Sequence, residues 1–201
     1  MYSRYLNKLW VVLIVSGFLV LGTQWQSTAS AQHEKHPPKK KVEHAVIRKH
    51  LHDASKAAEQ AKSLNRAFKG QRKSGGALTA ADIDVINEMK HHARSRSKAM
   101  EDLVASDPGM ALQAALTPEE RSQFPASVQA ELESAVDVEG ELEVIIEDNF
   151  EEGTFTTHHA IIAGKERYSL HFAEEPPELT SGSKVKVKGL RAGKRIAVPH
   201  Q

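Results

Sequence analysis

The chain has 201 residues and no cysteine. Disulfide bridges, a thiolate nucleophile and a lipid-modified N-terminal cysteine are therefore all excluded, and a folded domain must depend on its apolar core. Other catalytic signatures are missing too: the sequence has no His-Glu-x-x-His, no Gly-x-Ser-x-Gly and no glycine-rich phosphate loop. We therefore expect a protein that is not an enzyme, with no catalytic residues and no cofactor.

Long hydrophobic runs are limited to one stretch, from Leu9 to Leu21. A positive start precedes this stretch and small residues follow it at 29–31, which is the pattern of a secretory signal peptide. The stretch is about 20 Å long as a helix, too short for a bilayer core of about 30 Å. We predict cleavage after Ala31, export to the periplasm or the extracellular medium, and no integral membrane segment after cleavage; an uncleaved anchor is the alternative.

A large net charge is also lacking, because the formal value is +1. This balance conceals a division: residues 32–106 carry 16 Lys and Arg against 9 Asp and Glu, whereas residues 107–201 carry 9 against 17. Two halves of opposite charge attract each other, so basic helices are expected to dock on an acidic domain. The alternative is a basic arm reserved for an anionic partner. Residues 32–41, rich in His, Pro and Lys, are predicted to be a linker.

Helical periodicity dominates residues 42–106. Apolar residues recur at steps of three and four in two runs separated by a Gly-rich turn, and we predict an N-terminal helical hairpin. Thr79 followed by Asp82 is expected to cap the second helix, with Met89 and Met100 in its core. The apolar stripe weakens at residues 91–98, where loose packing is predicted. Residues 107–135 are expected to form a short helical connector, with a helix beginning at Thr117.

Alternating residues dominate 136–198. In the first run Val136, Val138, Leu142, Val144 and Ile146 share one parity and are expected to be buried, with Gly140 at a bend. Four more short strands follow, separated by turns and a Pro-Pro loop. Five strands in about sixty residues favour closure, which removes exposed edges, so the predicted fold class is α+β: the hairpin followed by a small five-stranded OB-like β-barrel.

Charged residues occupy the other parity of two strands. In an OB-like order the first strand pairs with the fourth, which places acids beside lysines. We interpret both runs mainly as a cross-strand charge ladder, with a binding patch as the alternative. The residues of that possible interaction site are Glu139, Glu141, Glu143, Lys184, Lys186 and Lys188.

Two histidines have outward parity on neighbouring strands. His158 and His171 could meet there and are weak candidates for a metal site, while His159 has inward parity. The outward positions of the second and third strands carry no aromatic residue on which bases could stack, and the domain is acidic. Nucleic acid is therefore not an expected partner.

Residues 112–198 resemble the N-terminal region found ahead of gametolysin-like metallopeptidase domains in secreted bacterial proteins. The resemblance consists of the Pro-Glu-x-Arg turn at 118–121, the Val-Glu-Gly-x-Leu-Glu run at 138–143, and the segment at 170–183 from Leu-His-Phe through Pro-Pro-Glu-Leu to Ser-Gly-Ser. It implies an exported, non-catalytic β module that accompanies another domain. Because the zinc motif of the peptidase is missing, no protease residues can be transferred to this chain.

These observations predict an exported, non-catalytic interaction module that binds a protein or a polysaccharide in the cell envelope or outside the cell. The alternative is a periplasmic protein that binds a metal ion or small ligand through some of its 11 histidines.

Overall fold

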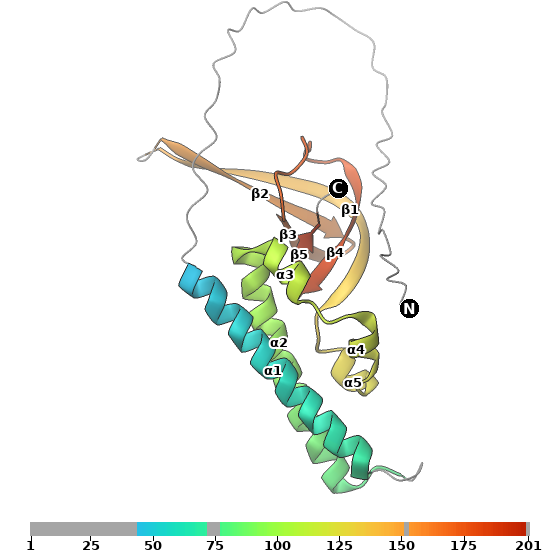
Figure 1. Ribbon diagram of the computed structural model, residues 1–201. Helices are drawn as coiled ribbons and strands as arrows, with labels where there is room; N and C mark the ends of the chain where they lie inside the picture. Colours follow the sequence, from blue (N-terminus) through green and yellow to red (C-terminus); the bar gives the residue numbers. More distant parts are fainter. Residues whose placement is uncertain (1–43, 72–76, 151–152, 200–201) are drawn as a thin grey trace, which may run out of the picture.

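A computed structural model describes residues 44–71, 77–150 and 153–199. As predicted, helices come first and a five-stranded sheet follows (Figure 1). The helices are α1 (His44–Gln71), α2 (Ala80–Ser106), α3 (Pro108–Ala114), α4 (Pro118–Ser122) and α5 (Ala126–Gln129). The strands are β1 (Ser134–Asn149), β2 (Thr154–Ala163), β3 (Glu166–Phe172), β4 (Lys184–Ala192) and β5 (Arg195–Val198).

The predicted signal peptide (1–31) and linker (32–41) lie outside the described residues. Among the helices that are described, none combines the length and the hydrophobicity that crossing a membrane requires.

The two long helices lie side by side (Figure 1) and meet through small residues. Ala54 belongs to one apolar cluster with Met100 and Leu103, and Ala61 belongs to another with Met89. Alanine lets the helix backbones approach closely, so the longer methionine side chains fill the space between them. Both methionines are fully buried, which confirms their predicted place in the core.

Helix starts follow the sequence rules. The backbone N–H of Asp82 donates to Thr79 Oγ1 at 3.2 Å, and the backbone N–H of Thr79 donates to Asp82 Oδ2 at 2.9 Å. The same reciprocal capping box joins Thr117 and Glu120 at the start of α4. Both predicted caps are therefore confirmed.

The predicted loose packing in the middle of α2 is wrong. Arg96 lies in that stretch and is 3% exposed, and Glu133, just before β1, is 2% exposed. Arg96 Nη2 donates to Glu133 Oε1 at 2.6 Å, and Arg96 Nε donates to the same oxygen at 3.0 Å. The stretch packs tightly because its buried guanidinium has a distant partner, which the periodicity of one helix does not reveal.

Backbone groups from other segments complete this ion pair. Arg96 donates through Nη1 to the carbonyl oxygen of Ala54 in α1 at 3.0 Å, and through Nη2 to that of Ala114 in α3 at 2.7 Å. Glu133 Oε1 also accepts from the backbone N–H of Leu116 at 3.1 Å. One buried pair thus joins three helices to the residue that precedes the sheet, and its hydrogen bonds offset the cost of desolvating two charges.

The sheet is built around β1, which has two partners in succession. Residues 134–141 pair antiparallel with β4, and residues 141–149 pair antiparallel with β2. The β3–β5 pair is parallel, and the strand order β1-β2-β3-β5-β4 returns to β1 and closes the sheet. The predicted pairing of the first and fourth strands is therefore confirmed.

Two glycines allow this closure. A Cβ atom on Gly140 in β1 would lie 2.3 Å from the carbonyl oxygen of Ile162 in β2. A Cβ atom on Gly189 in β4 would lie 2.3 Å from the carbonyl oxygen of Ala197 in β5. Neighbouring backbone passes so close at both points that only glycine fits, which accords with the bend predicted at Gly140.

Apolar clusters lie on both sides of the closed sheet. Its interior contains Leu142, Ile161, Leu170, Ile196 and Val198. On the outside, Leu190, Ala192 and Ala197 pack with residues of α1, α2 and α3. The helices therefore dock on the sheet through apolar contact, which contributes about 25 cal/mol per Å² of buried area.

Ion pairs between the two halves run in both directions. Lys62, Arg94 and Arg96 of the basic half pair with Glu120, Glu131 and Glu133 of the acidic half, as predicted. Where α2 meets the sheet itself, the direction is reversed. Here the helix supplies the acids, and the sheet supplies the cations. Arg195 Nη1 donates to the carbonyl oxygen of Glu101 at 2.9 Å and lies 3.4 Å from Asp102 Oδ1. The net charge of each half did not predict this contact because docking follows the apolar surface, and local pairs then form wherever that contact places them.

A double-mutant cycle on the buried pair should show strong coupling. Replacing Arg96 by Met leaves the Glu133 carboxylate buried without its partner, and the free energy of unfolding should fall by about 3–5 kcal/mol. Glu133→Leu alone should cost a similar amount. The double variant should lose clearly less than the sum of the two, because no lone charge remains. Urea unfolding measures all three values.

The matched control is Arg94→Met, which removes a solvent-exposed pair with Glu131 on the same helix. It should change stability little. If the losses of unfolding free energy caused by Arg96→Met and Glu133→Leu simply add in the double variant, the role assigned to the buried pair is contradicted. It is also contradicted if Arg94→Met lowers the unfolding free energy by as much as either of them.

Candidate docking surface on the β1–β2 arm

The outer ends of β1 and β2 run past the rest of the sheet (Figure 1). The pairing of β1 with β4 ends at Glu141, and the pairing of β2 with β3 begins only at His159. Within the part of the chain that the structure describes, residues 145–149 of β1 and 154–158 of β2 therefore pair only with each other. We call these two segments, with the intervening Phe150, the arm.

Each face of the arm continues a face of the closed sheet. The inner face, continuous with the buried Leu142, carries Ile146 and Phe155, while the outer face carries Ile145 and His158. Ile146 was predicted to be buried and is 67% exposed. That prediction is wrong because the side-chain alternation of β1 continues beyond the point where the ring provides an interior.

Large apolar side chains are exposed along the whole arm. Phe150 is 87% exposed, Ile145 42% and Phe155 37%. Single exposed apolar residues are normal on a protein surface, whereas large apolar patches are typical of interaction sites. Of the exposed residues of the arm, Ile146 and Phe155 share the inner face and Ile145 lies on the outer face.

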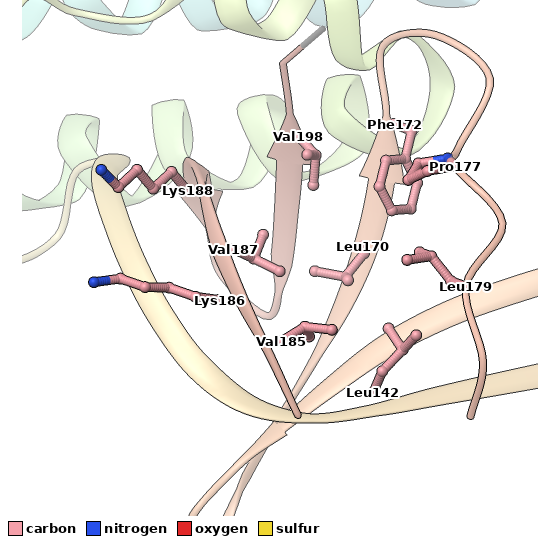
Figure 2. Close-up of a pocket in the computed structure, with 10 residues that line it drawn as sticks. All are labelled: Leu142, Leu170, Phe172, Pro177, Leu179, Val185, Lys186, Val187, Lys188 and Val198. Carbon is pink, nitrogen blue, oxygen red and sulfur yellow. The ribbon is translucent and has the colours of Figure 1, made fainter. Parts of the chain in front are cut away.

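The inner face of the arm leads into an apolar hollow at one end of the closed sheet. His159, opposite Val144, stacks edge-on against Phe172 with ring centroids 5.3 Å apart. Phe172 in turn lines the hollow together with Pro177 and Leu179, as Figure 2 shows. Lys186 and Lys188 also border it, but their ammonium groups point away from the apolar side chains (Figure 2). His159 therefore lies between the inner face of the arm and the residues that line the hollow.

The predicted charge ladder is present on the outside of the sheet. In the β1–β4 register, Glu139 lies opposite Lys186 and Glu141 lies opposite Lys184. Both Lys186 Nζ, at 3.3 Å, and Lys188 Nζ, at 3.9 Å, contact the carboxylate of Asp137. This arrangement agrees with the structural interpretation of the two runs, although surface pairs of this kind contribute only about 0–1 kcal/mol each.

Glu143, which was also predicted to belong to the possible interaction site, contacts β3 and not a lysine of β4. Glu143 Oε2 accepts a hydrogen bond from Arg167 Nε of β3 at 2.6 Å. The six predicted residues are thus spread along the outer surface of the sheet, next to residues of opposite charge. They do not form a patch of one sign.

The metal candidates lie in different surroundings. His158 Nε2 is 3.2 Å from Glu147 Oε2 on the arm, whereas His171 is partly buried and its Nε2 has no hydrogen-bond partner among the described residues. In the same ranges, no group of three or more His, Asp or Glu side chains could hold a metal ion. The structure therefore brings no third ligand to this pair.

The surroundings of two histidines lower their pKa values. Burial lowers the pKa of His159, with a further contribution from the neighbouring His158. Burial also lowers the pKa of His171, followed by the charges of Arg195 and His158.

Comparison of the chain with protein-family models, with curated proteins and with solved structures finds no significant match. The geometry of the arm and the sequence are therefore the basis for assigning a function.

Sequence reasoning did not identify the arm, although one signal was present. Ile145 and Ile146 place apolar residues on both faces of β1, and Phe150 stands in the following turn. A strand inside the closed sheet needs only one apolar face, so this doublet is the feature that could have indicated a projecting segment.

His159 and His171 predict a dependence of stability on pH. Their pKa values are lowered in the folded protein, so the unfolded chain binds protons first as pH falls below about 6.5. The free energy of unfolding should therefore decrease between pH 7 and pH 5. The variant His159→Gln/His171→Gln should show a smaller decrease, measured by urea unfolding at several pH values.

The control is His52→Gln, on the exposed side of α1. An unchanged pH dependence in the double variant, or an equal change in the control, would contradict this assignment.

Proposed function

We propose that this chain is an exported, non-catalytic interaction module that binds a protein partner in the cell envelope or outside the cell through the inner face of its arm. The closed sheet is then an OB-like barrel, and α1 with α2 an antiparallel hairpin docked on it. The strand order and the parallel β3–β5 pair support the barrel assignment. The signal-peptide pattern and the resemblance at 112–198 support export and a module that accompanies another domain.

One observation carries the choice of surface: Ile146 and Phe150, at 67% and 87%, are among the most exposed large apolar residues described. Burying such side chains against a partner is favourable by about 25 cal/mol per Å². Interfaces are enriched in aromatic side chains at their centres, surrounded by a polar rim. On the arm, the polar residues are Asp148, which lies opposite Phe155 on the inner face, and Glu147 on the outer face.

A protein fits this surface better than a polysaccharide does. Sugar hydroxyl groups lose hydrogen bonds to water on binding and need polar groups in return. Isoleucine and phenylalanine provide none. The nearby carboxylates favour a partner whose apolar patch is bordered by Lys or Arg, and they make its association rate dependent on salt.

Site-specific photo-cross-linking tests the proposal. A photoreactive phenylalanine at Phe150, in the exported protein within envelope and culture fractions, should give a discrete protein adduct. The same amino acid at Lys165, an exposed residue of the β2–β3 turn, is the matched control and should not give that adduct. Adding Ile146→Thr should lower the yield at position 150 by at least about fivefold.

No adduct at position 150, or the same adducts at both positions, would contradict the proposal. So would a yield that Ile146→Thr leaves unchanged.

A further inference from the structure

Among the described residues, no strand pairs with residues 154–158 of β2 on the side that faces away from β1. Leu142 bonds through its N–H and its carbonyl to Ser183 and Gly182, on the β4 side of β1. Backbone groups alternate in direction along an antiparallel strand, so the odd-numbered residues of β1 face β2.

The register then shows in which direction the backbone N–H and C=O groups of each β2 residue in the arm point. Thr154, Thr156 and His158 lie opposite odd-numbered residues of β1 and bond to them. Phe155 and Thr157 direct their N–H and C=O groups outward, away from β1. In the described part of the chain, the backbone hydrogen bonds made outside helices and strands involve neither residue.

This edge lacks the features that normally prevent strands from adding to one another. Natural edge strands carry Lys, Pro or bulges, or are covered by other elements. The sequence from Thr154 to His158 is Thr-Phe-Thr-Thr-His, with no Lys, Pro, Gly, Asp or Glu. It is rich in β-branched residues, which favour extended structure.

We infer that two copies of this chain associate by antiparallel pairing of their β2 edges about a two-fold axis at Thr156. In this register Phe155 of one copy forms a hydrogen-bonded pair with Thr157 of the second copy, and the symmetric pair forms as well. Thr156 then faces Thr156 of the second copy in a non-hydrogen-bonded pair, where side chains lie closest. One register therefore pairs the outward backbone groups of both copies and also obeys the two-fold symmetry of a closed dimer.

The faces of the arm agree with this pairing. The inner faces of the two arms become one surface, on which Ile146 and Phe155 of both copies lie together. On the outer face, His158 lies opposite Thr154 of the second copy, so the new strand pair contains no directly opposed like charges.

Charge also permits a second copy to approach. The acids of the arm, Glu147 and Asp148, are on β1, so those of the two copies are three strand spacings apart, or about 14 Å. The screening length at physiological salt is about 8 Å, so repulsion between them is weak. This inference is independent of the proposed partner, because it uses the strand edge and leaves the inner face exposed.

Because the chain has no cysteine, the proposed pairing can be tested by introducing a single cysteine and looking for a disulfide between two copies. Cα atoms in a non-hydrogen-bonded pair are about 4.5 Å apart, within the range of a disulfide. Thr156→Cys in the exported protein should therefore form a covalent dimer under mild oxidation. Thr154→Cys, on the same face and strand, is the matched control, because its two copies would be four residues apart along the strands, about 14 Å, and should not be bridged.

The uncross-linked protein should show monomer–dimer exchange by sedimentation, with a dissociation constant on the order of tens of micromolar, as for a small interface. Thr157→Pro removes an outward N–H without touching the β1 ladder and should weaken association at least tenfold. Thr157→Val keeps the backbone N–H, so this variant should associate as strongly as the original protein.

Failure of Thr156→Cys to form a dimer, or equal bridging by Thr154→Cys, would overturn the inference. A Thr156→Cys adduct to a protein of different mass would also overturn it, by assigning the edge to a strand of another protein.

Discussion

The buried ion pair between Arg96 and Glu133 is the contact on which the rest of the structure depends. Removing two charges from water is costly, and the cost is offset only when both groups have their hydrogen bonds. Those bonds come from α1, α3 and the segment after it, as well as from the two side chains. The pair therefore forms only when all these segments are in place, which favours one arrangement of helices and sheet over alternatives with a similar apolar core.

Glu133 also marks the start of β1, whose successive pairing partners lead from the buried ion pair to the arm. The strand begins at the residue after the buried pair, and its first half is paired with β4. At Gly140 the backbone of β2 passes close to the strand, and from Glu141 the strand pairs with β2. Its outer half then leaves the sheet as the arm. This strand thus connects a buried ion pair to Ile146, one of the most exposed large apolar residues in the described part of the chain.

The sequence predicts local features of this fold well. The caps at Thr79 and Thr117, the alternation in β1 and its register with β4 depend on neighbouring residues or on period two. The pairing of Arg96 with Glu133 could not be predicted in this way, because both residues look like ordinary surface charges in their own segments.

The arm was missed for a similar reason. Side chains alternate in the same manner inside and outside a closed sheet, so Ile146 looked like a core residue. What places it outside is the extent of pairing: β2 pairs with β1 from Thr154 onward, but with β3 only from His159 onward. Comparing the 10 residues of β2 with the 7 of β3 is the step that would have indicated a projecting segment.

Hydrogen–deuterium exchange of the Glu133→Gln variant, measured peptide by peptide against the original protein, tests most directly whether the buried pair unites helices and sheet. The account predicts that α1, α2 and residues 134–141 of β1 lose protection together, because they share one contact. Loss of protection confined to the helices, with residues 134–141 and their β4 partners unchanged, would contradict it.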